Sequence, residues 1–167
     1  MSDTHCFPPI EAPSAKVLIL GSIPSAASLA ANEYYAHPRN QFWRIIADLL
    51  KNGPLVDYSS KIQALIDAGI VLWDVMKSCN RPGSLDAAID KQSIVTNDFN
   101  CFFAGHQKIR QVFFNGMTAE TSFRRLVLPE LKCQPLNLHR LPSTSPTHAA
   151  LNYQQKLEAW RVVVGRL

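Results

Sequence analysis

The sequence predicts an α/β protein, a three-layer α/β/α sandwich built on a mainly parallel four-stranded sheet. Short apolar runs that end in glycine or a polar residue alternate with longer segments whose apolar residues recur at helical spacing. Strands and helices that alternate in this way are typical of a parallel sheet with helices on both faces. The 167-residue chain contains no linker and no repeat, so we expect one domain over residues 1–167.

Four apolar segments are the predicted strands. They are rich in Val, Ile, Leu and Phe, as expected for strands that are buried on both faces. They span residues 16–21, 70–75, 111–116 and 136–141.

The predicted helices lie between and after these strands, with residues 78–84 as a loop. They span residues 42–50, 59–69, 97–105, 118–128 and 149–164, and a helical turn is expected over residues 26–31. Ser59 or Ser60 is the expected cap of the second helix, and Asn97 that of the third.

The composition narrows the class of protein. The net charge of +4 permits a polyanionic partner but does not require one. The four cysteines form no Cys-x-x-Cys pair, which argues against a zinc ribbon or a clustered iron–sulfur site. The sequence shows neither a signal pattern nor an apolar run of membrane-spanning length, so we expect a cytoplasmic protein.

Residues 34–43 are the most unusual stretch of the chain. They read Tyr-Tyr-Ala-His-Pro-Arg-Asn-Gln-Phe-Trp, and we interpret this turn before a helix as the floor of a binding pocket. Tyr35 is expected either to fill the core or to offer a flat ring on which a base stacks. Asn40 is expected either to cap the helix or to hold a water for a reaction that develops positive charge on carbon.

A second distinctive stretch follows the last predicted strand. Pro142, Ser143, Thr144, Ser145, Pro146, Thr147 and His148 form a stiff loop with three hydroxyl residues between its prolines. If a helix begins at Ala149, these hydroxyls and the helix N-terminus form a phosphate site. The alternative is a capped loop with Thr147 as the N-cap, and both roles are compatible.

The loop after the first predicted strand, Gly21-Ser22-Ile23-Pro24-Ser25, matches no familiar phosphate or nucleophile motif. It lacks the Gly-Lys-Ser/Thr ending of a Walker loop, the three glycines of a dinucleotide turn and the Gly-x-Ser-x-Gly elbow. Ligands of parallel α/β sheets bind at the carboxyl ends of the strands. We therefore expect residues 21–40, 74–83, 115–116 and 142–148 to converge there, without a metal.

Taken in order, the motifs of this chain resemble those of the uracil-DNA glycosylase superfamily, and most closely its hypoxanthine-DNA (deoxyinosine) glycosylase branch. The resemblance covers nearly the whole chain. It rests on the segments 18–25, 34–43 and 141–146.

The resemblance implies a monofunctional enzyme that flips a deaminated base, with hypoxanthine favoured, out of double-stranded DNA and hydrolyses its glycosidic bond. By the same resemblance, Asn40 positions the water, Tyr35 stacks on the base, and groups near Ser22, Ile23 and Asn115 bond its edge. The loop from Pro142 to His148 is implied to bind DNA. No cofactor is expected, and we expect a monomer.

Ile23 departs from the pattern of the superfamily. Many members place Asp or Asn at this position to activate water, so here the catalytic role falls to Asn40. Three alternatives stay open: a uracil or thymine mismatch-specific glycosylase, a non-catalytic nucleic-acid-binding module, and a small-molecule hydrolase that uses Ser22 or Ser25.

Overall fold

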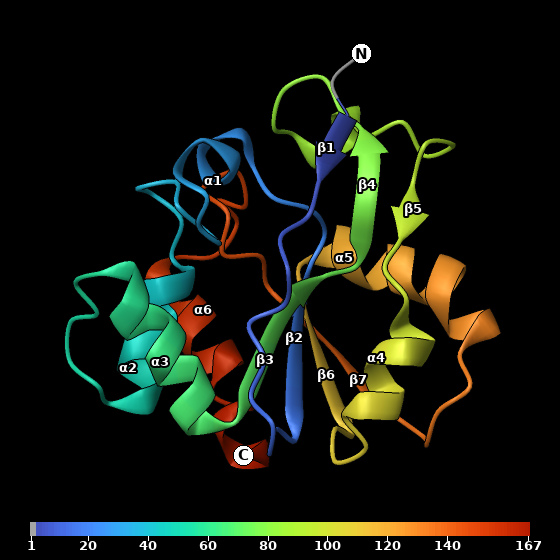
Figure 1. Cartoon of the computed structure of the whole chain (residues 1–167). Helices are drawn as coiled ribbons and strands as arrows, with labels where there is room; N and C mark the ends of the chain where they lie inside the picture. Colours follow the sequence, from blue (N-terminus) through green and yellow to red (C-terminus); the bar gives the residue numbers. More distant parts are fainter. Residues whose placement is uncertain (1–2) are drawn as a thin grey trace.

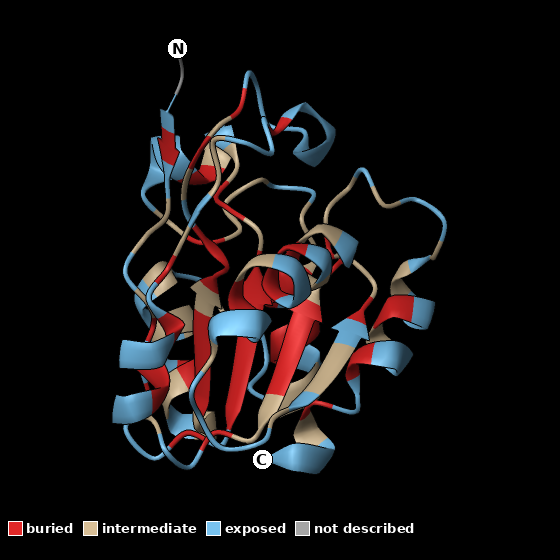
Figure 2. Cartoon of the chain, turned by 90° about the vertical axis from the view of Figure 1, so that its right-hand side faces the viewer, coloured by how far each residue is buried: buried red, intermediate tan, exposed pale blue. Residues whose placement is uncertain are grey.

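A parallel four-stranded sheet forms the centre of the computed structural model, which describes residues 3–167 (Figure 1). Its strand order is β3-β2-β6-β7. The strands are β2 (Val17–Gly21), β3 (Ile70–Asp74), β6 (Gln111–Asn115) and β7 (Asn137–Leu141). Strand β2 is buried throughout, whereas the edge strand β7 is partly exposed (Figure 2). The four predicted strands and the predicted α/β class are confirmed.

Helices cover both faces of this sheet, as Figure 1 shows. On one face lie α2 (Phe42–Leu50), α3 (Tyr58–Ala68) and α6 (Tyr153–Trp160), which share an apolar core with the sheet. On the other face lie α4 (Phe99–Gly105) and α5 (Met117–Ser122), which form a second core. The short helix α1 (Ala26–Ala31) lies beyond the carboxyl ends of the strands.

A second, antiparallel sheet was not predicted. It consists of β1 (Asp3–His5), β4 (Met76–Asn80) and β5 (Val95–Thr96), in the order β1-β4-β5. The expectation of a loop over residues 78–84 is therefore wrong for its first part. Strand β4 forms because it pairs with the distant N-terminal segment, and this pairing leaves no local pattern in the sequence.

The caps of α3 and α4 also differ from the prediction. Asp57, not Ser59 or Ser60, caps α3, and its side chain accepts a hydrogen bond of 2.7 Å from the N–H of Ser60. Asp98, not Asn97, caps α4. In both cases a nearby aspartate is the N-cap instead of the expected residue. Asp, Asn and Ser have about equal preferences for the N-cap position, so the sequence does not distinguish between them.

The last helix begins at Tyr153 instead of Ala149. Asn152 and Gln155 form a reciprocal capping box, with two hydrogen bonds of 2.9 Å between side chain and backbone. Thr147 is therefore not the N-cap of this helix, and no helix N-terminus supports the loop before it. The predicted helix 118–128 is likewise shorter, because α5 passes into a π-turn (Phe123–Val127) and a 3₁₀ turn (Leu128–Glu130).

The register of the sheet brings the ends of the strands together. Gly21 at the end of β2 lies opposite Asp74 at the end of β3, and Asn115 of β6 lies opposite Leu141 of β7. The loops that leave these residues thus start at one edge of the sheet. This confirms the predicted convergence of the four segments.

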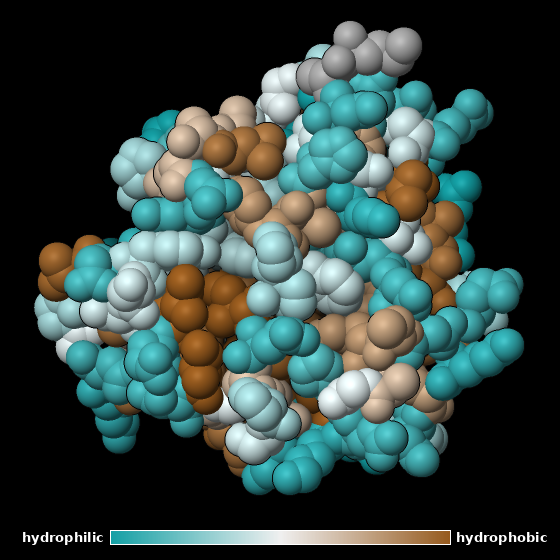
Figure 3. Space-filling view, in the orientation of Figure 1, coloured by the Kyte–Doolittle hydropathy of each residue, from teal (hydrophilic) through white to brown (hydrophobic). Residues whose placement is uncertain are grey.

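The surface seen in Figure 3 is mostly hydrophilic, and its apolar side chains form separate patches, as is usual for a small protein. Among residues 3–167, no helix is long and apolar enough to cross a membrane. In the same part of the chain, no group of three or more His, Cys, Asp and Glu residues is placed to hold a metal ion.

Candidate active site

A cavity of about 170 Å³ lies at the carboxyl edge of the sheet, where the four segments meet. It is smaller than a typical pocket for a drug-sized ligand, and it suits a single ring system. Its lining comprises residues 21–25, Ser28, Tyr34, Tyr35, Asn40, Asp74, Arg81, Ser84, Leu85, Asp86, Asn115, 143–145 and Thr147. All the predicted catalytic and base-binding residues are among them.

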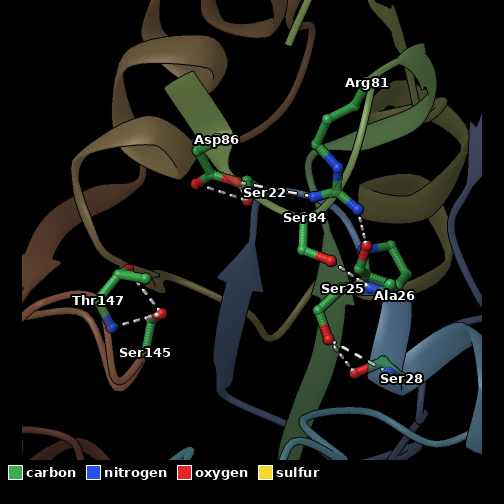
Figure 4. Close-up of polar contacts among 10 residues, drawn as sticks. Ser22, Ser25, Ala26, Ser28, Arg81, Ser84, Asp86, Ser145 and Thr147 are labelled. Atoms are coloured by element: carbon green, nitrogen blue, oxygen red, sulfur yellow. Dashed lines mark hydrogen bonds and ion pairs between the residues drawn. The ribbon is translucent and has the colours of Figure 1, made fainter. Parts of the chain in front are cut away.

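The loop after β2 is held in place by the segment that follows β4 (Figure 4). The guanidinium of Arg81 is buried, donates a hydrogen bond to the carbonyl of Pro24 and lies 3.8 Å from the carboxylate of Asp86. Asp86 in turn accepts a hydrogen bond of 3.2 Å from the hydroxyl of Ser22. These contacts fix the shape of one wall of the cavity.

Ile23 contributes only apolar surface to this wall. It is 7% exposed and packs with Met76, Cys79 and Ile89. The side chain at this position therefore has no group that binds or activates water.

Tyr35 reaches the floor of the cavity from a strained backbone. Its φ of 54° lies in the left-handed region, which is unfavourable for a bulky residue. One face of its ring stacks on Phe42, with the ring centroids 4.2 Å apart, so only the opposite face is available to a ligand. Its hydroxyl is buried, and burial together with the nearby Asp74 raises the pKa of this phenol.

Asn40 has a structural role and also lines the cavity. Its Oδ1 accepts a hydrogen bond of 2.9 Å from the N–H of Phe42, the first residue of α2. This is the capping contact that the sequence suggested. Because the side chain is partly exposed and lines the cavity, the predicted catalytic role is geometrically compatible with the cap.

The loop after β7 is tied to β6 and to the start of α2. The Asn115 side chain donates to the hydroxyl of Thr144 and accepts from its N–H, both at 2.9 Å. The carbonyl of Thr144 accepts a hydrogen bond of 3.0 Å from the N–H of Gln41, next to Asn40. Thr144 is completely buried, so its side chain supports the loop from inside. This hydrogen bond joins residues 34–43 directly to the loop of residues 142–148.

The hydroxyl residues on either side of Thr144 lie closer to solvent. Ser145 and Thr147 bond to each other through their hydroxyls at 2.8 Å (Figure 4), and the Ser143 hydroxyl accepts from the N–H of Ser145 at 3.2 Å. Ser143, Ser145 and Thr147 line the cavity, whereas Pro142, Pro146 and His148 of the predicted DNA-binding loop do not.

Comparison with known proteins identifies the family. A model of the uracil DNA glycosylase superfamily matches residues 8–164. The chain belongs to this superfamily. The prediction from the three motifs is confirmed, and the protein is a DNA glycosylase of this group.

Two curated relatives carry the name hypoxanthine DNA glycosylase. The one from Methanosarcina barkeri is 34% identical over 111 residues, which cover 66% of this chain and 69% of the relative. The one from Methanosarcina acetivorans is 37% identical over 114 residues, which cover 68% and 71%. The solution NMR structure of a candidate uracil DNA glycosylase from M. acetivorans superposes with a TM-score of 0.79 at 30% identity, covering 98% of this chain and 97% of that one.

The glycosylase has a further polar residue in its cavity that the sequence analysis did not single out. Asp74, the last residue of β3, is 3% exposed and lines the cavity. Burial, reinforced by the negative charge of Asp86, raises the pKa of this carboxyl to about 7, against the lowering effect of Arg81. An acidic residue at the end of an apolar strand is visible in the sequence, but its burial beside the cavity is not.

Proposed function

We propose that this chain is a DNA repair enzyme, a single monofunctional glycosylase domain over residues 1–167 that removes a deaminated base from double-stranded DNA. The observation that carries the proposal is that Asn40 and Tyr35 line the same small cavity as the hydroxyl loop after β7. Hypoxanthine is the favoured base because two relatives bear that name. In this proposal the enzyme acts as a monomer without metal or cofactor.

In this proposal the damaged nucleotide is flipped out of the duplex, so that its base enters the cavity. Extruding the nucleotide costs a few kcal/mol, least for a base that is already mismatched. The free face of Tyr35 then stacks on the base, and groups near Ser22, Ile23 and Asn115 border its edge. The glycosidic bond breaks toward an oxocarbenium-like sugar, and Asn40 positions the water that attacks it. No lysine nucleophile takes part, so the product is an abasic site in an unbroken strand.

The loop from Pro142 to His148 holds the DNA in this proposal. Ser143 and Ser145 bond the phosphates that flank the flipped nucleotide, and Thr147 lies beside them. The proposal is supported by the mutual hydroxyl bond of Ser145 and Thr147, since both hydroxyls can rotate toward a phosphate oxygen without moving the backbone.

The test is base release from defined duplexes. The protein is incubated with duplexes that contain deoxyinosine, deoxyxanthosine or deoxyuridine opposite each normal base, and the product is treated with alkali to reveal abasic sites. We expect strand scission after alkali only, and the fastest reaction with deoxyinosine. Absence of abasic product from all these substrates overturns the proposal.

Substitutions of Asn40 separate its two roles. Asn40→Ala removes both the cap and the amide, whereas Asn40→Ser keeps a cap acceptor for the N–H of Phe42 but is too short to hold the water. If the amide is catalytic, both variants lose about 10²–10³ in the single-turnover rate, as for the loss of one preorganised polar group. A fully active Asn40→Ser enzyme shows that the cap alone matters.

There are two other candidate functions, of which Ile23 favours only the first and the name of the NMR structure favours the second. One is a non-catalytic nucleic-acid-binding module, which predicts DNA binding that weakens with salt but no base release from any lesion. The other is a uracil or thymine mismatch-specific glycosylase, which the same panel of duplexes detects once deoxythymidine opposite deoxyguanosine is added.

A further inference from the structure

The buried carboxyl of Asp74 lines the cavity, and one of its oxygens has no hydrogen-bond partner among the described residues. Its Oδ2 is shielded from solvent and is bonded to no group among residues 3–167. The backbone of Asp74 is fixed instead, because its carbonyl accepts a hydrogen bond of 2.8 Å from the side chain of Asn97. Buried polar atoms are nearly always paired in proteins, so an unpaired one in a ligand cavity calls for a functional reason.

A second unpaired group converges on the same place. The hydroxyl of Tyr35 is buried near the side chain of Asn115, but it makes no hydrogen bond of good geometry with any described residue. A Cβ atom added at Gly21 would lie 2.5 Å from Oδ1 of Asp74 and 2.8 Å from this hydroxyl. Both oxygens therefore approach the backbone of Gly21 so closely that only glycine fits. This arrangement presents two polar groups to one small space.

The surroundings of Asp74 favour its neutral form. The ionisable groups that act on it are the carboxylate of Asp86, which disfavours a second negative charge, and the guanidinium of Arg81, which partly compensates. Tyr34, Tyr35 and Cys6 also interact electrostatically with Asp74, and all three have raised pKa values, so they stay uncharged near neutral pH. Asp74 therefore carries a proton in much of the enzyme at neutral pH, and a carboxylic acid is a hydrogen-bond donor.

We propose that Asp74 is the general acid of this glycosylase and that its carboxyl group donates a proton to the base as the base leaves. This inference rests on the proposed function. Purine bases leave poorly as anions, and a positioned acid removes that difficulty. In this proposal, stacking on Tyr35 holds the base next to the carboxyl of Asp74. The hydroxyl of Tyr35 lies near that carboxyl, beside Gly21.

The proposed reaction is a hydrolysis of the glycosidic bond. The bond between the sugar C1′ and the base nitrogen breaks, and its electron pair goes to the base, which takes the proton from Asp74 and leaves neutral. The water held by Asn40 adds to C1′ and releases its proton to solvent. Solvent then reprotonates the Asp74 carboxylate.

The first test is the pH dependence of single-turnover base release from a deoxyinosine duplex. The wild-type rate should fall about tenfold per pH unit above roughly pH 7, because the acid form is lost there. Asp74→Asn should lower the rate about 10²–10⁴-fold and abolish this alkaline limb, while DNA binding changes little. A variant rate within threefold of wild type with the same pH profile overturns the proposal.

Asp86→Asn provides a second, milder variant. Removing the Asp86 charge lowers the pKa of Asp74, so the alkaline limb should move to lower pH without disappearing. A limb that stays in place shows that it belongs to another group, and this result overturns the proposal even if Asp74→Asn does not fold.

Infrared difference spectra of wild type against Asp74→Asn give a readout that does not depend on activity. They should show a protonated carboxyl near pH 6 that is lost near pH 9. If the Asp74 carboxyl is already ionised at pH 6, the general-acid role is overturned but the proposed glycosylase function is not. If the carboxyl is protonated but the wild type releases no base from any duplex, the proposed function fails, and the general-acid role fails with it.

Discussion

Replacing the buried acid Asp74 by asparagine should make the stability of the protein less dependent on pH. The folded protein holds the pKa of this carboxyl at about 7, against an ordinary value of 3.8. Between these values the folded chain keeps the proton while the unfolded chain loses it, so unfolding releases a proton and stability falls as pH rises. Below about pH 4 both states are protonated, and above about pH 7 the folded protein bears the full cost of a buried charge.

The size of this effect follows from the two pKa values. At about 1.4 kcal/mol for each tenfold change in proton affinity, the wild type loses roughly 4 kcal/mol of unfolding free energy through this group between about pH 4 and pH 8. Asp74→Asn has no such loss, so its stability relative to wild type should improve by roughly that amount over the range. The loss is large compared with the 5–15 kcal/mol that typically stabilises a domain.

Urea unfolding followed by circular dichroism measures the effect at a series of pH values. Asp67→Asn is a matched control, because Asp67 is an exposed carboxylate on α3 whose charge is screened by water. The difference between wild type and this control should stay nearly constant. A difference between wild type and Asp74→Asn that is equally constant refutes the argument that burial keeps the carboxyl neutral.

Three further substitutions test the packing around the cavity. Gly21→Ala should cost about 1–3 kcal/mol, because the new methyl group overlaps Asp74 and Tyr35, and its penalty in urea unfolding should shrink when combined with Tyr35→Phe. Tyr35→Phe alone should leave stability equal or raise it by about 1 kcal/mol, because it removes a buried hydroxyl that makes no well-formed hydrogen bond with residues 3–167; a clear loss in thermal unfolding contradicts this. Asn115→Ala should cost about 2 kcal/mol or more by the same assay, because it leaves two groups of the buried Thr144 unpaired, whereas an unchanged midpoint contradicts the inferred support of the loop.

Much of the fold follows from local features of the sequence. The four parallel strands are short apolar runs, and α2 shows its apolar stripe plainly, so both are recognised without tertiary information. Strand β4 is different, because it pairs with residues 3–5, which lie far away in the sequence, and with β5. The predicted start of α6 is wrong, because the capping box at Asn152 starts the helix there and not at the hydroxyl loop before it.

The candidate site likewise has parts that the sequence predicts and parts that only the structure shows. The segment from Tyr34 to Trp43 and the loop from Pro142 to His148 are conspicuous by composition, and their order along the chain led to the correct family. The sequence does not reveal that the Asn115 amide both donates to Thr144 and accepts from it, or that Thr144 accepts a hydrogen bond from the residue after Asn40. These are contacts between loops from different strands.

By itself the sequence determined the class of fold and the family, and it predicted Tyr35 and Asn40 as the centre of the site. Only the tertiary structure decided which neighbours act on them. The register of β2 against β3 sets Asp74 beside Gly21, and the loop after β4 brings the charge of Asp86 near it. The physical reason is that burial and electrostatic interaction depend on distance in space, so an aspartate that looks ordinary in the chain acquires a raised pKa where it is buried beside the cavity.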